Sequence, residues 1–596
     1  MAKPQSVTKN LAKLASKIPQ NRDKARSNLR PVYSLDTETW QGNIFLIADS
    51  DGDFIDTYKE TITVDTVLKF LTRKKLETSW NFFYNLSYDA SVILKLLGKI
   101  LNNYRKTRKL SFKYQNYSIT YYPKKVLKIQ KNHHSWNYYD IAQFYNYKKL
   151  HQAYLDNIDI LPDDYLKYKS KRAEFSPNYY KYNKKGIRNY CINDCKLTKE
   201  LSEHWIKLFY DAFGFYPARW ISAGYLAEKV LINNQINIPK FNQFPYALQE
   251  FAYSSAFGGR FEIVVRGFIG RAYLYDINSA YPFAFSNIPD ITKGKWIKRK
   301  TIHPKALLGF FKIETNIPEE KYIPPFGFRR NNPSKTLVFP TGSFVTYCTL
   351  DELKACENPK WYKILDSWQY LDQNPTYPYR QFIEKLYKKR LQLKQQNNPL
   401  QLPFKIILNA MYGKTGHKNG NKIGNLFNPI IFATITGKTR AQLYQFCIEH
   451  EIERQVISFA TDSICTTKKL NLSSKRLGNF SLDKQAKDVY YLQNGIYRFN
   501  ESWKNRGLGN LGGKEIEHLD TYVKGEKLYR KFTINRVKQL RSSIIQNEIS
   551  EIGKIKPVVR EVDLNADNKR FWLGQLSKID NSTNYSMPLS ANHFLI

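Results

Sequence analysis

The chain has 596 residues, which is too long for a single hydrophobic core and predicts two to four domains. Its 93 Lys and Arg residues against 52 Asp and Glu residues give a formal net charge of +41, which indicates a polyanionic partner or substrate because solubility alone seldom needs such an excess. Aromatic residues make up 15% of the chain, and basic side chains interleaved with aromatic ones suit single-stranded nucleic acid, which offers phosphates together with unstacked bases.

The cysteines and the apolar residues favour a cytosolic protein. The six cysteines are scattered without the second pair or the histidine cluster that would complete a zinc site, so we expect reduced thiols (Cys191, Cys195, Cys348, Cys356, Cys447 and Cys465). No apolar run approaches the length of a membrane span, and the N-terminus lacks the apolar core of a secretory signal. Residues 1–30 are rich in Lys and Arg and predict a flexible basic arm.

Regular structure is expected from Pro31 onward. Residues 32–38 predict a strand, and residues 43–48 predict its hairpin partner across a Gln41-Gly42 turn. Asp36 and Glu38 are two residues apart, so on a strand both carboxylates face the same side. Two like charges there repel each other unless a cation lies between them.

Two predicted helices add further acids. Residues 81–95 predict a strand that passes through Asn85 into a helix starting near Asp89, and residues 187–205 predict a helix on which Tyr190 and Asp194 share one face. Four acids on a strand pair and two helices make a two-metal nuclease centre, where one ion and Tyr190 orient a water for attack on a phosphodiester. Singly, each residue is more simply a core aromatic or a solvated acid, but chance produces the ordered set far less easily.

These segments resemble a known family. Leu-Asp36-Thr-Glu38, Asn85-Leu-Ser-Tyr88-Asp89 and Tyr190-x-x-x-Asp194 are similar to the three motifs of the DEDDy-type proofreading 3′–5′ exonuclease, which precedes the polymerase in family B DNA polymerases. The resemblance implies that the acids hold metals and that Asn85 and Tyr88 hold the unpaired primer end. It also implies a lysine on the scissile phosphate, for which Lys167 is the candidate.

A glycine pair lies in the connection that follows, residues 206–265. Phe257-Gly258-Gly259-Arg260 suits close backbone approach followed by a basic contact. It resembles the Tyr-x-Gly-Gly segment that links exonuclease to polymerase in protein-primed members and touches the template, although Ala256 occupies the Tyr position. A tight turn between strands is an equally good interpretation.

Two distant carboxylates are predicted to meet at strand ends. Residues 273–283 indicate a buried strand that ends in Asp276 and then breaks, and residues 456–464 indicate a strand, a tight turn at Asp462 and a second strand. A carboxylate beside an apolar sheet needs a partner charge or a metal. Two of them on adjacent strand ends form the cradle that holds two divalent ions in phosphoryl transfer.

Between these acids the sequence predicts a basic pair of helices. A helix from about residue 380 to 396 carries Arg390 and Lys394 on one face, and the next carries Lys405, Asn409 and Tyr412 on one face until Gly413 stops it. Arg and Lys presented across a short turn form a binding surface for a triphosphate. A solvated helix pair is the alternative, and it suits Lys394 better than Asn409.

The same stretches resemble two polymerase motifs of family B. Asp276-x-Asn-Ser279-Ala280-Tyr281-Pro resembles motif A of the protein-primed members, and Lys405-Ile-Ile-Leu-Asn409-Ala-Met-Tyr412-Gly resembles motif B with Ala410 where Ser is usual. The resemblance implies that Asp276 binds metal, that Ser279 and Ala280 support the triphosphate and that Tyr281 excludes a ribose 2′-hydroxyl. Lys405 would neutralise the triphosphate, and Tyr412 would pack beneath the nascent base pair.

The downstream half departs from the family pattern in several places. Ala460-Thr-Asp462-Ser resembles motif C, but Ala460 replaces its first acid. Gly495 stands where a Lys-x-Tyr motif has its lysine, and residues 414–427 leave room only for a short form of the second insertion of protein-primed phage enzymes. Lys504-Asn-Arg506 resembles a basic primer-contact loop of linear-plasmid members.

The sequence thus predicts an α/β multidomain fold in which an N-terminal RNase H-like exonuclease domain precedes a right-hand polymerase of palm, fingers and thumb. The expected divisions are as follows: basic N-terminal segment 1–30, exonuclease 31–215, linker 216–265, first palm part 266–379 with an insertion at about 325–380, fingers 380–415, second palm part 416–510, and a thumb of basic helices and loops 511–596.

The resemblance implies a DNA polymerase with proofreading that starts on a terminal protein of a linear phage or plasmid genome. The expected cofactor is Mg²⁺ in both centres, with Mn²⁺ as a substitute, and the expected state is a cytoplasmic monomer. Expected partners are primer-template and single-stranded DNA, deoxynucleoside triphosphates, the terminal protein and a single-stranded-DNA-binding protein. Two alternatives stay open: an exonuclease whose polymerase half has decayed, and a non-catalytic nucleic-acid-binding protein.

Overall fold

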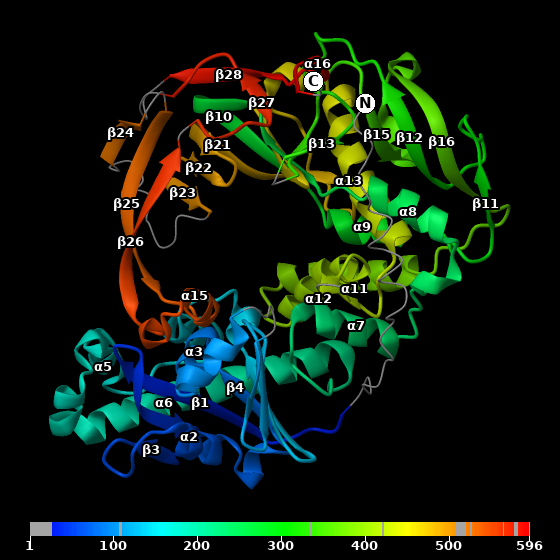
Figure 1. Cartoon of the computed structure of the whole chain (residues 1–596). Coiled ribbons are helices and arrows are strands. Elements are labelled where there is room, and N and C mark those ends of the chain that lie inside the picture. Colours follow the sequence, from blue (N-terminus) through cyan, green and yellow to red (C-terminus); the bar gives the residue numbers. More distant parts are fainter. Residues whose placement is uncertain are drawn as a thin grey trace.

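The computed structural model of the chain describes residues 27–105, 110–332, 335–419, 422–506, 520–524, 527–563, 565–576 and 582–594. The predicted basic arm of residues 1–30 lies almost wholly outside these ranges. Two large β-sheets dominate the rest, one near each end of the view in Figure 1, and helices lie between them.

The first sheet builds an N-terminal domain, blue to cyan in Figure 1. It has eight strands in the order β3-β2-β1-β4-β8-β7-β6-β5, and only the β1–β4 and β4–β8 pairs are parallel. The predicted hairpin of residues 32–48 is confirmed, and Gln41 and Gly42 both have positive φ (51° and 71°), as a two-residue hairpin turn requires. The strands are β1 (Val32–Trp40), β2 (Asn43–Asp49), β3 (Phe54–Asp56), β4 (Trp80–Phe83), β5 (Ser111–Tyr114), β6 (Tyr117–Tyr122), β7 (Val126–Lys131) and β8 (His134–Asp140).

One long helix, α6 (Pro177–Phe213), packs on β1 and β2 and contains the predicted helix of residues 187–205. Ser176 caps its start by accepting from the backbone N–H of Tyr179 at 3.1 Å, Pro177 fills the first turn, and Gly214 ends it at φ 71°. The other helices of this domain are α2 (Val64–Leu71), α3 (Ser87–Lys95), α4 (Leu150–Asn157) and α5 (Tyr165–Ser170), with a 3₁₀ turn at Arg172–Glu174.

The second sheet, called here the central sheet, has nine strands and is antiparallel throughout. Its main order is β23-β22-β21-β10-β20-β19-β9, and β28 pairs with both β10 and β27. Helix α13 (Pro429–Glu449) supplies Leu443, Phe446 and Cys447 to its core. The strands are β9 (Arg260–Ile263), β10 (Val265–Ile277), β19 (Val456–Thr461), β20 (Ser463–Thr466), β21 (Phe480–Gln493), β22 (Ile496–Phe499), β23 (Ser502–Asn505), β27 (Arg570–Trp572) and β28 (Thr583–Pro588).

Helices α11 (Arg380–Gln395) and α12 (Gln401–Thr415) form the predicted basic pair. The prediction that Gly413 stops the second helix is wrong, because α12 continues to Thr415; this helix packs on α7 and α11. Tertiary packing here outweighs the helix-weakening effect of one glycine. The remaining helices of this region are α7 (Ala223–Asn233), α8 (Tyr246–Ser255) and α9 (Ala280–Ser286).

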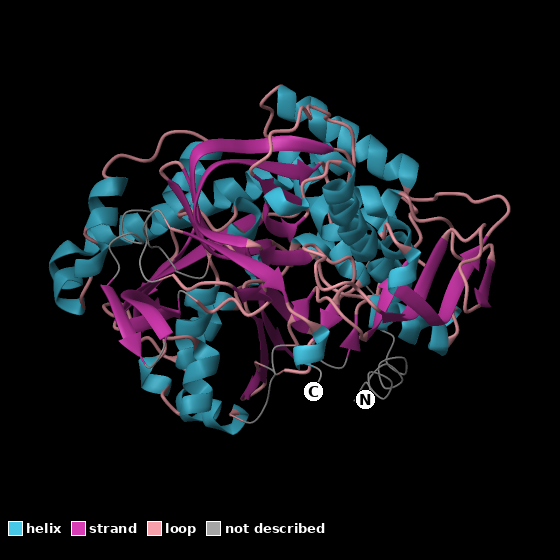
Figure 2. Cartoon of the chain, turned by 90° about the horizontal axis from the view of Figure 1, so that it is seen from above, coloured by secondary structure: helices cyan, strands magenta, loops and turns pink. Residues whose placement is uncertain are grey.

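A four-stranded antiparallel sheet forms the right-hand edge of the molecule in Figures 1 and 2. Its order is β11-β16-β12-β15, and it starts at residue 295, ahead of the insertion expected at about 325–380. Its elements are β11 (Lys295–Lys298), β12 (Leu308–Thr315), β15 (Val345–Thr349), α10 (Leu350–Ala355) and β16 (Tyr362–Leu371), with a small hairpin of β13 (Phe328–Arg329) and β14 (Leu337–Val338). Residues 414–427, where only a short second insertion is expected, contain a second small hairpin, β17 (Lys418–Asn419) and β18 (Lys422–Ile423).

The region after residue 520 contains mostly strands, so the prediction of basic helices there is wrong. A three-stranded sheet, called here the arm, consists of β24 (Asp520–Lys524), β25 (Lys527–Val537) and β26 (Ile555–Asp563) and extends from the central sheet toward the N-terminal domain in Figure 1. Its tip carries α15 (Leu540–Gln546), which contacts α3. Leu540, Ile544 and Ile552 are buried in the core of the N-terminal domain. The chain ends with β27, β28 and α16 (Ala591–Phe594) back at the central sheet.

Within the described residues, no helix is both long and apolar enough to cross a bilayer. The six cysteines are all buried and unpaired with one another as disulfides.

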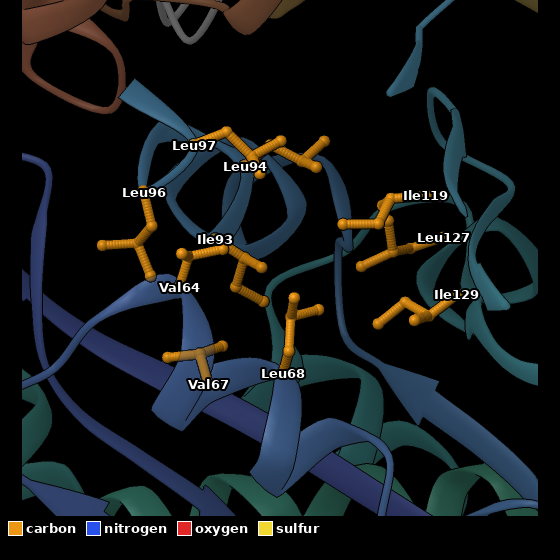
Figure 3. Close-up of a pocket in the computed structure, with 10 residues that line it drawn as sticks. All are labelled: Val64, Val67, Leu68, Ile93, Leu94, Leu96, Leu97, Ile119, Leu127 and Ile129. Carbon is orange, nitrogen blue, oxygen red and sulfur yellow. The ribbon is translucent and has the colours of Figure 1, made fainter. Parts of the chain in front are cut away.

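Figure 3 shows an apolar cavity in the N-terminal domain, lined by residues such as Leu68 of α2, Ile93 of α3 and Ile129 of β7. Its volume is about 10 Å³, enough for at most one water, and its lining is almost wholly apolar. It is a packing space in the core and carries no polar group that would orient a ligand.

Candidate active sites at two carboxylate clusters

The first cluster joins β1 to two helices of the N-terminal domain. Asp36 and Glu38 lie on β1, and one oxygen from each lies within 4.8 Å of the other and of the Cys191 thiol on α6. Asp89, on α3, and Asp194, on α6, are close enough that their negative charges help to raise the pKa of Asp36 above its usual range, after burial itself. The structure therefore brings together the four acids predicted from three separated segments.

Burial dominates the electrostatics of this cluster. It raises the pKa of Glu38 to about 7 although Arg172 opposes the shift, and it raises the pKa of Asp89 to about 7 although Thr37 donates a hydrogen bond of 2.7 Å to its Oδ1. Arg172 Nε lies 3.5 Å from Glu38 Oε2. Carboxylates crowded in a buried place favour protons or cations.

Sequence reasoning missed Arg172. Arg172 lies in the 3₁₀ turn just before α6, and the negative charge of Glu38 is the main cause of the raised pKa of Arg172. The only sequence signal was a crowd of cations at residues 167–172. Lys169 acts on Glu38 from the same crowd, whereas Lys167 is exposed, with its Nζ 3.7 Å from Asp164. The structure does not bring Lys167 to the acids.

Two tyrosines lie against the acids. Tyr190 is buried on α6, its ring contacts those of Tyr165 and Phe175, and burial raises the pKa of its hydroxyl, so the group is a neutral phenol. Tyr165 donates a short hydrogen bond to Asp194 Oδ1. The predicted pair Tyr190 and Asp194 thus faces the cluster from one helix.

Asn85 and Tyr88 lie at the junction of β4 and α3. Asn85 has φ 60°, and its backbone N–H donates to Asp140 Oδ1 at 3.1 Å, which fixes the bend between strand and helix. The Tyr88 hydroxyl hydrogen-bonds that of Thr39 and lies 3.5 Å from the carbonyl oxygen of Gly553, at the tip of the arm.

The donor set of this cluster fits a divalent cation. Glu38 Oε1 is buried and lacks a hydrogen-bond partner among the described residues, and Glu38 as a whole is 1% exposed. A buried ionised oxygen without a partner is costly, and a cation with oxygen ligands would remove that cost.

The second cluster lies at the centre of the central sheet. Asp276, near the end of β10, pairs with Ser463 of β20, and the backbone N–H of Ile277 donates to the carbonyl oxygen of Asp462 at 3.0 Å. The structure therefore places the two predicted acids on adjacent strand ends. Burial raises the pKa of both, and Asp462 and Asp483 help to bring that of Asp276 to about 7.

Asp483 is a third acid that sequence reasoning missed. It lies on β21, next to β10, where the pairing has a bulge between Leu274 and Tyr275. It is exposed, and its charge contributes to the raised pKa of Asp276. A carboxylate therefore stands near this cluster even though Ala460 occupies the first acidic position of motif C.

The turn that carries Asp462 is unusually tight. Its backbone N–H donates to the carbonyl oxygen of Ala460 at 2.9 Å, and the intervening Thr461 has φ 74°. A β-branched residue at positive φ is strained, and such strain gathers at functional sites. A Cβ on Gly259 would lie 2.7 Å from Thr461 Cγ2, so the second glycine of the predicted pair is required by this turn.

The backbone on the N-terminal side of Gly259 is fixed by hydrogen bonds from a buried arginine. Arg440 of α13 donates to the carbonyl oxygens of Phe257 (2.8 Å) and Gly258 (3.0 Å) and forms a buried ion pair with Glu352 of α10. Phe257 is buried and Gly258 is exposed.

The expected contact of Arg260 with DNA requires correction. This residue is 1% exposed, and its guanidinium donates to Glu262 and to the carbonyl oxygen of Pro324. Because a buried guanidinium needs hydrogen-bond partners, these donors are used within the protein and do not face DNA.

Among the predicted nucleotide-binding residues, Arg390 contacts Ser279, three positions after Asp276, and Tyr412 contacts Tyr281. Arg390 Nη1 donates to Ser279 Oγ at 3.1 Å, while its Nε is buried without a hydrogen-bond partner among the described residues. The rings of Tyr281 and Tyr412 stack with centroids 3.9 Å apart. The others of this set are the buried Ala280 and the exposed Lys394, Lys405 and Asn409.

Lys504 and Arg506 lie on and just after β23, at the edge of the central sheet. Both are exposed, and the Arg506 guanidinium lies 5.2 Å from the ring centre of Phe261. The backbone N–H of Arg506 donates to the carbonyl oxygen of Gly495 at 3.0 Å. The structure thus joins the predicted basic loop to the place where the Lys-x-Tyr lysine is missing.

Comparison with known families gives a match over more than half of the chain. A family model described as DNA polymerase type B, organellar and viral, matches residues 77–427. The DNA polymerase of Acidianus bottle-shaped virus (isolate Italy/Pozzuoli) is 27% identical over 299 residues, 46% of this chain and 43% of that protein. A probable DNA polymerase of Ascobolus immersus is 23% identical over 385 residues, 62% of this chain and 30% of that protein. The chain spans less than half the length of these curated relatives.

Solved structures of phi29 DNA polymerase resemble the fold. The complex with primer-template DNA and incoming nucleotide substrates gives a TM-score of 0.59 at 14% identity and covers 90% of this chain and 100% of that one. The complex with single-stranded DNA gives 0.58 at 15% identity with the same coverage. The likeness confirms the predicted fold class, an α/β multidomain chain with an RNase H-like N-terminal domain followed by a right-hand polymerase fold.

Proposed function

Because the chain belongs to the family of DNA polymerases of type B, organellar and viral, we propose that it is a template-directed DNA polymerase that proofreads with a 3′–5′ exonuclease. The observation that carries the proposal is the placement of Asp276 and Asp462 on adjacent strand ends, with Arg390 of α11 reaching Ser279 beside them. In this proposal the N-terminal domain is the exonuclease, the central sheet is the palm, α11 and α12 are the fingers, and the arm is the thumb.

In the polymerase centre, Asp276 and Asp462 would hold Mg²⁺, with Mn²⁺ as a substitute. Bound there, the ions would lower the barrier to attack of a primer 3′-hydroxyl on the α-phosphate of a deoxynucleoside triphosphate. Arg390, with Lys394 and Lys405, compensates the charge of the leaving pyrophosphate. Buried Arg390 Nε lacks a partner among the described residues, so it has a donor to offer a phosphate oxygen.

The stacked rings of Tyr281 and Tyr412 support the choice of deoxyribose. A rigid ring beneath the sugar rejects a 2′-hydroxyl by overlap, and the 3.9 Å separation leaves Tyr281 little freedom to turn away. Asn409 and the backbone at Ser279 and Ala280 complete the proposed nucleotide site.

In the exonuclease centre, Asp36, Glu38, Asp89 and Asp194 would hold the same kind of ion, which supplies an activated water. Tyr190, as a neutral phenol, orients that water by a hydrogen bond. Asn85 and Tyr88 would receive the unpaired primer end, and Arg172 and Lys169 are better placed than Lys167 to contact the scissile phosphate.

The proposed partners follow from these two centres. Primer-template DNA, single-stranded DNA and incoming nucleotides are bound to the phi29 enzyme in the structures that this fold resembles. Priming on a terminal protein is supported by the motif A residues Asp276–Pro282 and the Gly258-Gly259 linker, and a single-stranded-DNA-binding protein would assist. Transfer of labelled dAMP onto a partner protein, without any nucleic-acid primer, tests that mode of initiation.

Extension from a mismatched primer tests the main proposal. The wild-type protein with Mg²⁺ and four triphosphates should trim the mismatch and extend; Asp36→Ala should extend without trimming, and Asp462→Ala should trim without extending. Trimming without extension by the wild type would leave an exonuclease with a decayed polymerase half, which Ala460 favours. Neither activity, with binding unchanged in both variants, would leave a non-catalytic nucleic-acid-binding protein.

A further inference from the structure

The exonuclease centre contains a thiol that the proposed reaction does not use. Cys191 is fully buried on α6, and its Sγ lies 3.9 Å from Asp36 Oδ2. Its Sγ and one oxygen each from Asp36 and Glu38 all lie within 4.8 Å of one another. Among the residues that the structure describes, this is the one group of three such ligand atoms so close together.

This donor set differs from the one that Mg²⁺ prefers. Mg²⁺ takes oxygen ligands almost exclusively, whereas Zn²⁺ and Cd²⁺ accept a thiolate together with carboxylates. With Zn–S of about 2.3 Å and Zn–O of about 2.0–2.2 Å, sulfur and oxygen ligands of one tetrahedral ion lie roughly 3.5 Å apart. The observed 3.9 Å between Cys191 Sγ and Asp36 Oδ2 is close to that separation.

A second observation points to a ligand at the same place. Glu38 Oε1 is buried and has no hydrogen-bond partner within the described part of the chain, while Arg172 lies on the side of Oε2. Glu38 as a whole is 1% exposed, so bulk solvent does not reach the unpartnered oxygen. Asp36 is only partly buried, so this member of the group is in contact with solvent.

We propose that Asp36, Glu38 and Cys191 form a site for a thiophilic divalent cation, Zn²⁺ or Cd²⁺, that competes with Mg²⁺ in the exonuclease centre. On binding, the S–H bond of Cys191 breaks, its proton passes to the buffer, and a sulfur–metal bond forms without any change of oxidation state. Held by Asp36, Glu38 and Cys191, this ion would displace the Mg²⁺ that supplies the activated water, so trimming would stop. The inhibition rests on the proposed exonuclease function, but the binding does not.

The polymerase centre should respond differently. Among the residues that the structure describes, neither Asp276 nor Asp462 belongs to a group of three close ligand atoms that includes a thiol. Zn²⁺ or Cd²⁺ should therefore suppress trimming at concentrations that leave extension nearly unchanged, so that a trace metal would shift the balance of the two activities.

Cd²⁺ binding to the whole protein tests the site directly. Titration should produce the ultraviolet thiolate-to-Cd²⁺ charge-transfer band with one equivalent bound, and Cys191→Ser should abolish the band and weaken binding by at least about tenfold. Cys195→Ser is the matched control, because this thiol lies one turn further along α6, donates to the carbonyl oxygen of Ala48 at 3.3 Å and is outside the three-atom group. It should keep the band.

Three outcomes are decisive. A Cys191→Ser protein that keeps the band, or a wild-type protein whose bound ¹¹³Cd shows no sulfur ligand by NMR, would overturn the proposal; the NMR measurement needs no variant, so a folding failure of Cys191→Ser cannot rescue it. Trimming by wild type and Cys195→Ser should be half-inhibited at a Zn²⁺ concentration at least about tenfold lower than for Cys191→Ser. A Cd²⁺ band in a protein without exonuclease activity would refute the proposed exonuclease but not the proposed metal site.

Discussion

Replacing Glu38 with glutamine is expected to stabilise the metal-free protein at pH 8. The wild-type carboxylate is buried between Asp36 and Arg172, and burial raises its pKa from an ordinary 4.5 to about 7. At pH 8 it is ionised in both the folded and the unfolded chain, but the folded chain holds the charge at a cost. Glutamine has nearly the same shape without that charge.

The magnitude follows from linkage between protonation and folding. Each pH unit between the pKa values of the folded and unfolded chain corresponds to about 1.4 kcal/mol, so the ionised Glu38 lowers the free energy of unfolding by ~3 kcal/mol. Because the folded pKa is raised, this loss is absent below about pH 4.5, grows between 4.5 and about 7, and is complete above that range. The opposing attraction of Arg172 is already contained in the raised value.

Urea unfolding in EDTA at pH 5 and pH 8 measures the effect. The free energy of unfolding of Glu38→Gln should exceed that of the wild type by ~3 kcal/mol at pH 8 and by much less at pH 5. Added Mg²⁺ should reduce this difference in stability, because only the wild-type carboxylate attracts the ion. Glu60→Gln, at an exposed position, should stay within about 0.5 kcal/mol of the wild type at both pH values. A Glu38→Gln protein no more stable than the wild type at pH 8 would refute the reasoning.

Three further changes test other parts of the structure. Ile544→Ala, at the tip of the arm, should cost about 2–5 kcal/mol of contact with the N-terminal domain and shorten the products made per binding event in a primer-extension assay; unchanged product lengths would contradict this. Gly259→Ala should reduce extension while trimming persists, because its methyl group would collide with Thr461 in the turn that carries Asp462; equal loss of both activities would point to misfolding instead. Glu352→Gln should destabilise the protein by roughly 3–5 kcal/mol, measured by thermal unfolding, because it leaves the buried Arg440 uncompensated; a melting temperature equal to that of the wild type would argue against the ion pair.

The sequence predicts best those parts of the fold that depend on residues close together in the chain. The hairpin at residues 32–49 carries its own turn residues, Gln41 and Gly42, and the hairpin at Asp462 lies between two apolar strands. The placement of Asp276 and Asp462 on adjacent strand ends was also predictable, because an acid at the end of an apolar strand needs a partner charge or a metal.

Long-range register hides the rest. Asp483 reaches Asp276 only through the pairing of β21 with β10 and its bulge, which no local pattern reveals. Arg172 approaches Glu38 from a three-residue 3₁₀ turn, too short to leave a periodic signal. Arg260 looked like a free base in a glycine-rich linker, but its ion pair with Glu262 depends on burial within the central sheet.

The arm shows how composition can mislead. Its strands β25 and β26 mix apolar residues such as Ile534 and Val559 with many cations in no regular order, and the region was predicted to hold basic helices and loops. Two strands that reach out from a sheet bury little on either side, so their apolar alternation is weak.

The two ends of the arm have a topological consequence. The N-terminal domain and the central sheet are joined covalently through α7 and α8 and joined again, without a covalent bond, where α15 rests on α3. If the duplex product passes between these two junctions, a linear molecule can thread in by its terminus while the second junction stays shut. A covalently closed circle has no free end, so it could be bound or released only when Leu540 and Ile544 leave the core of the N-terminal domain. The lifetime of this contact would then set how long a circle stays bound.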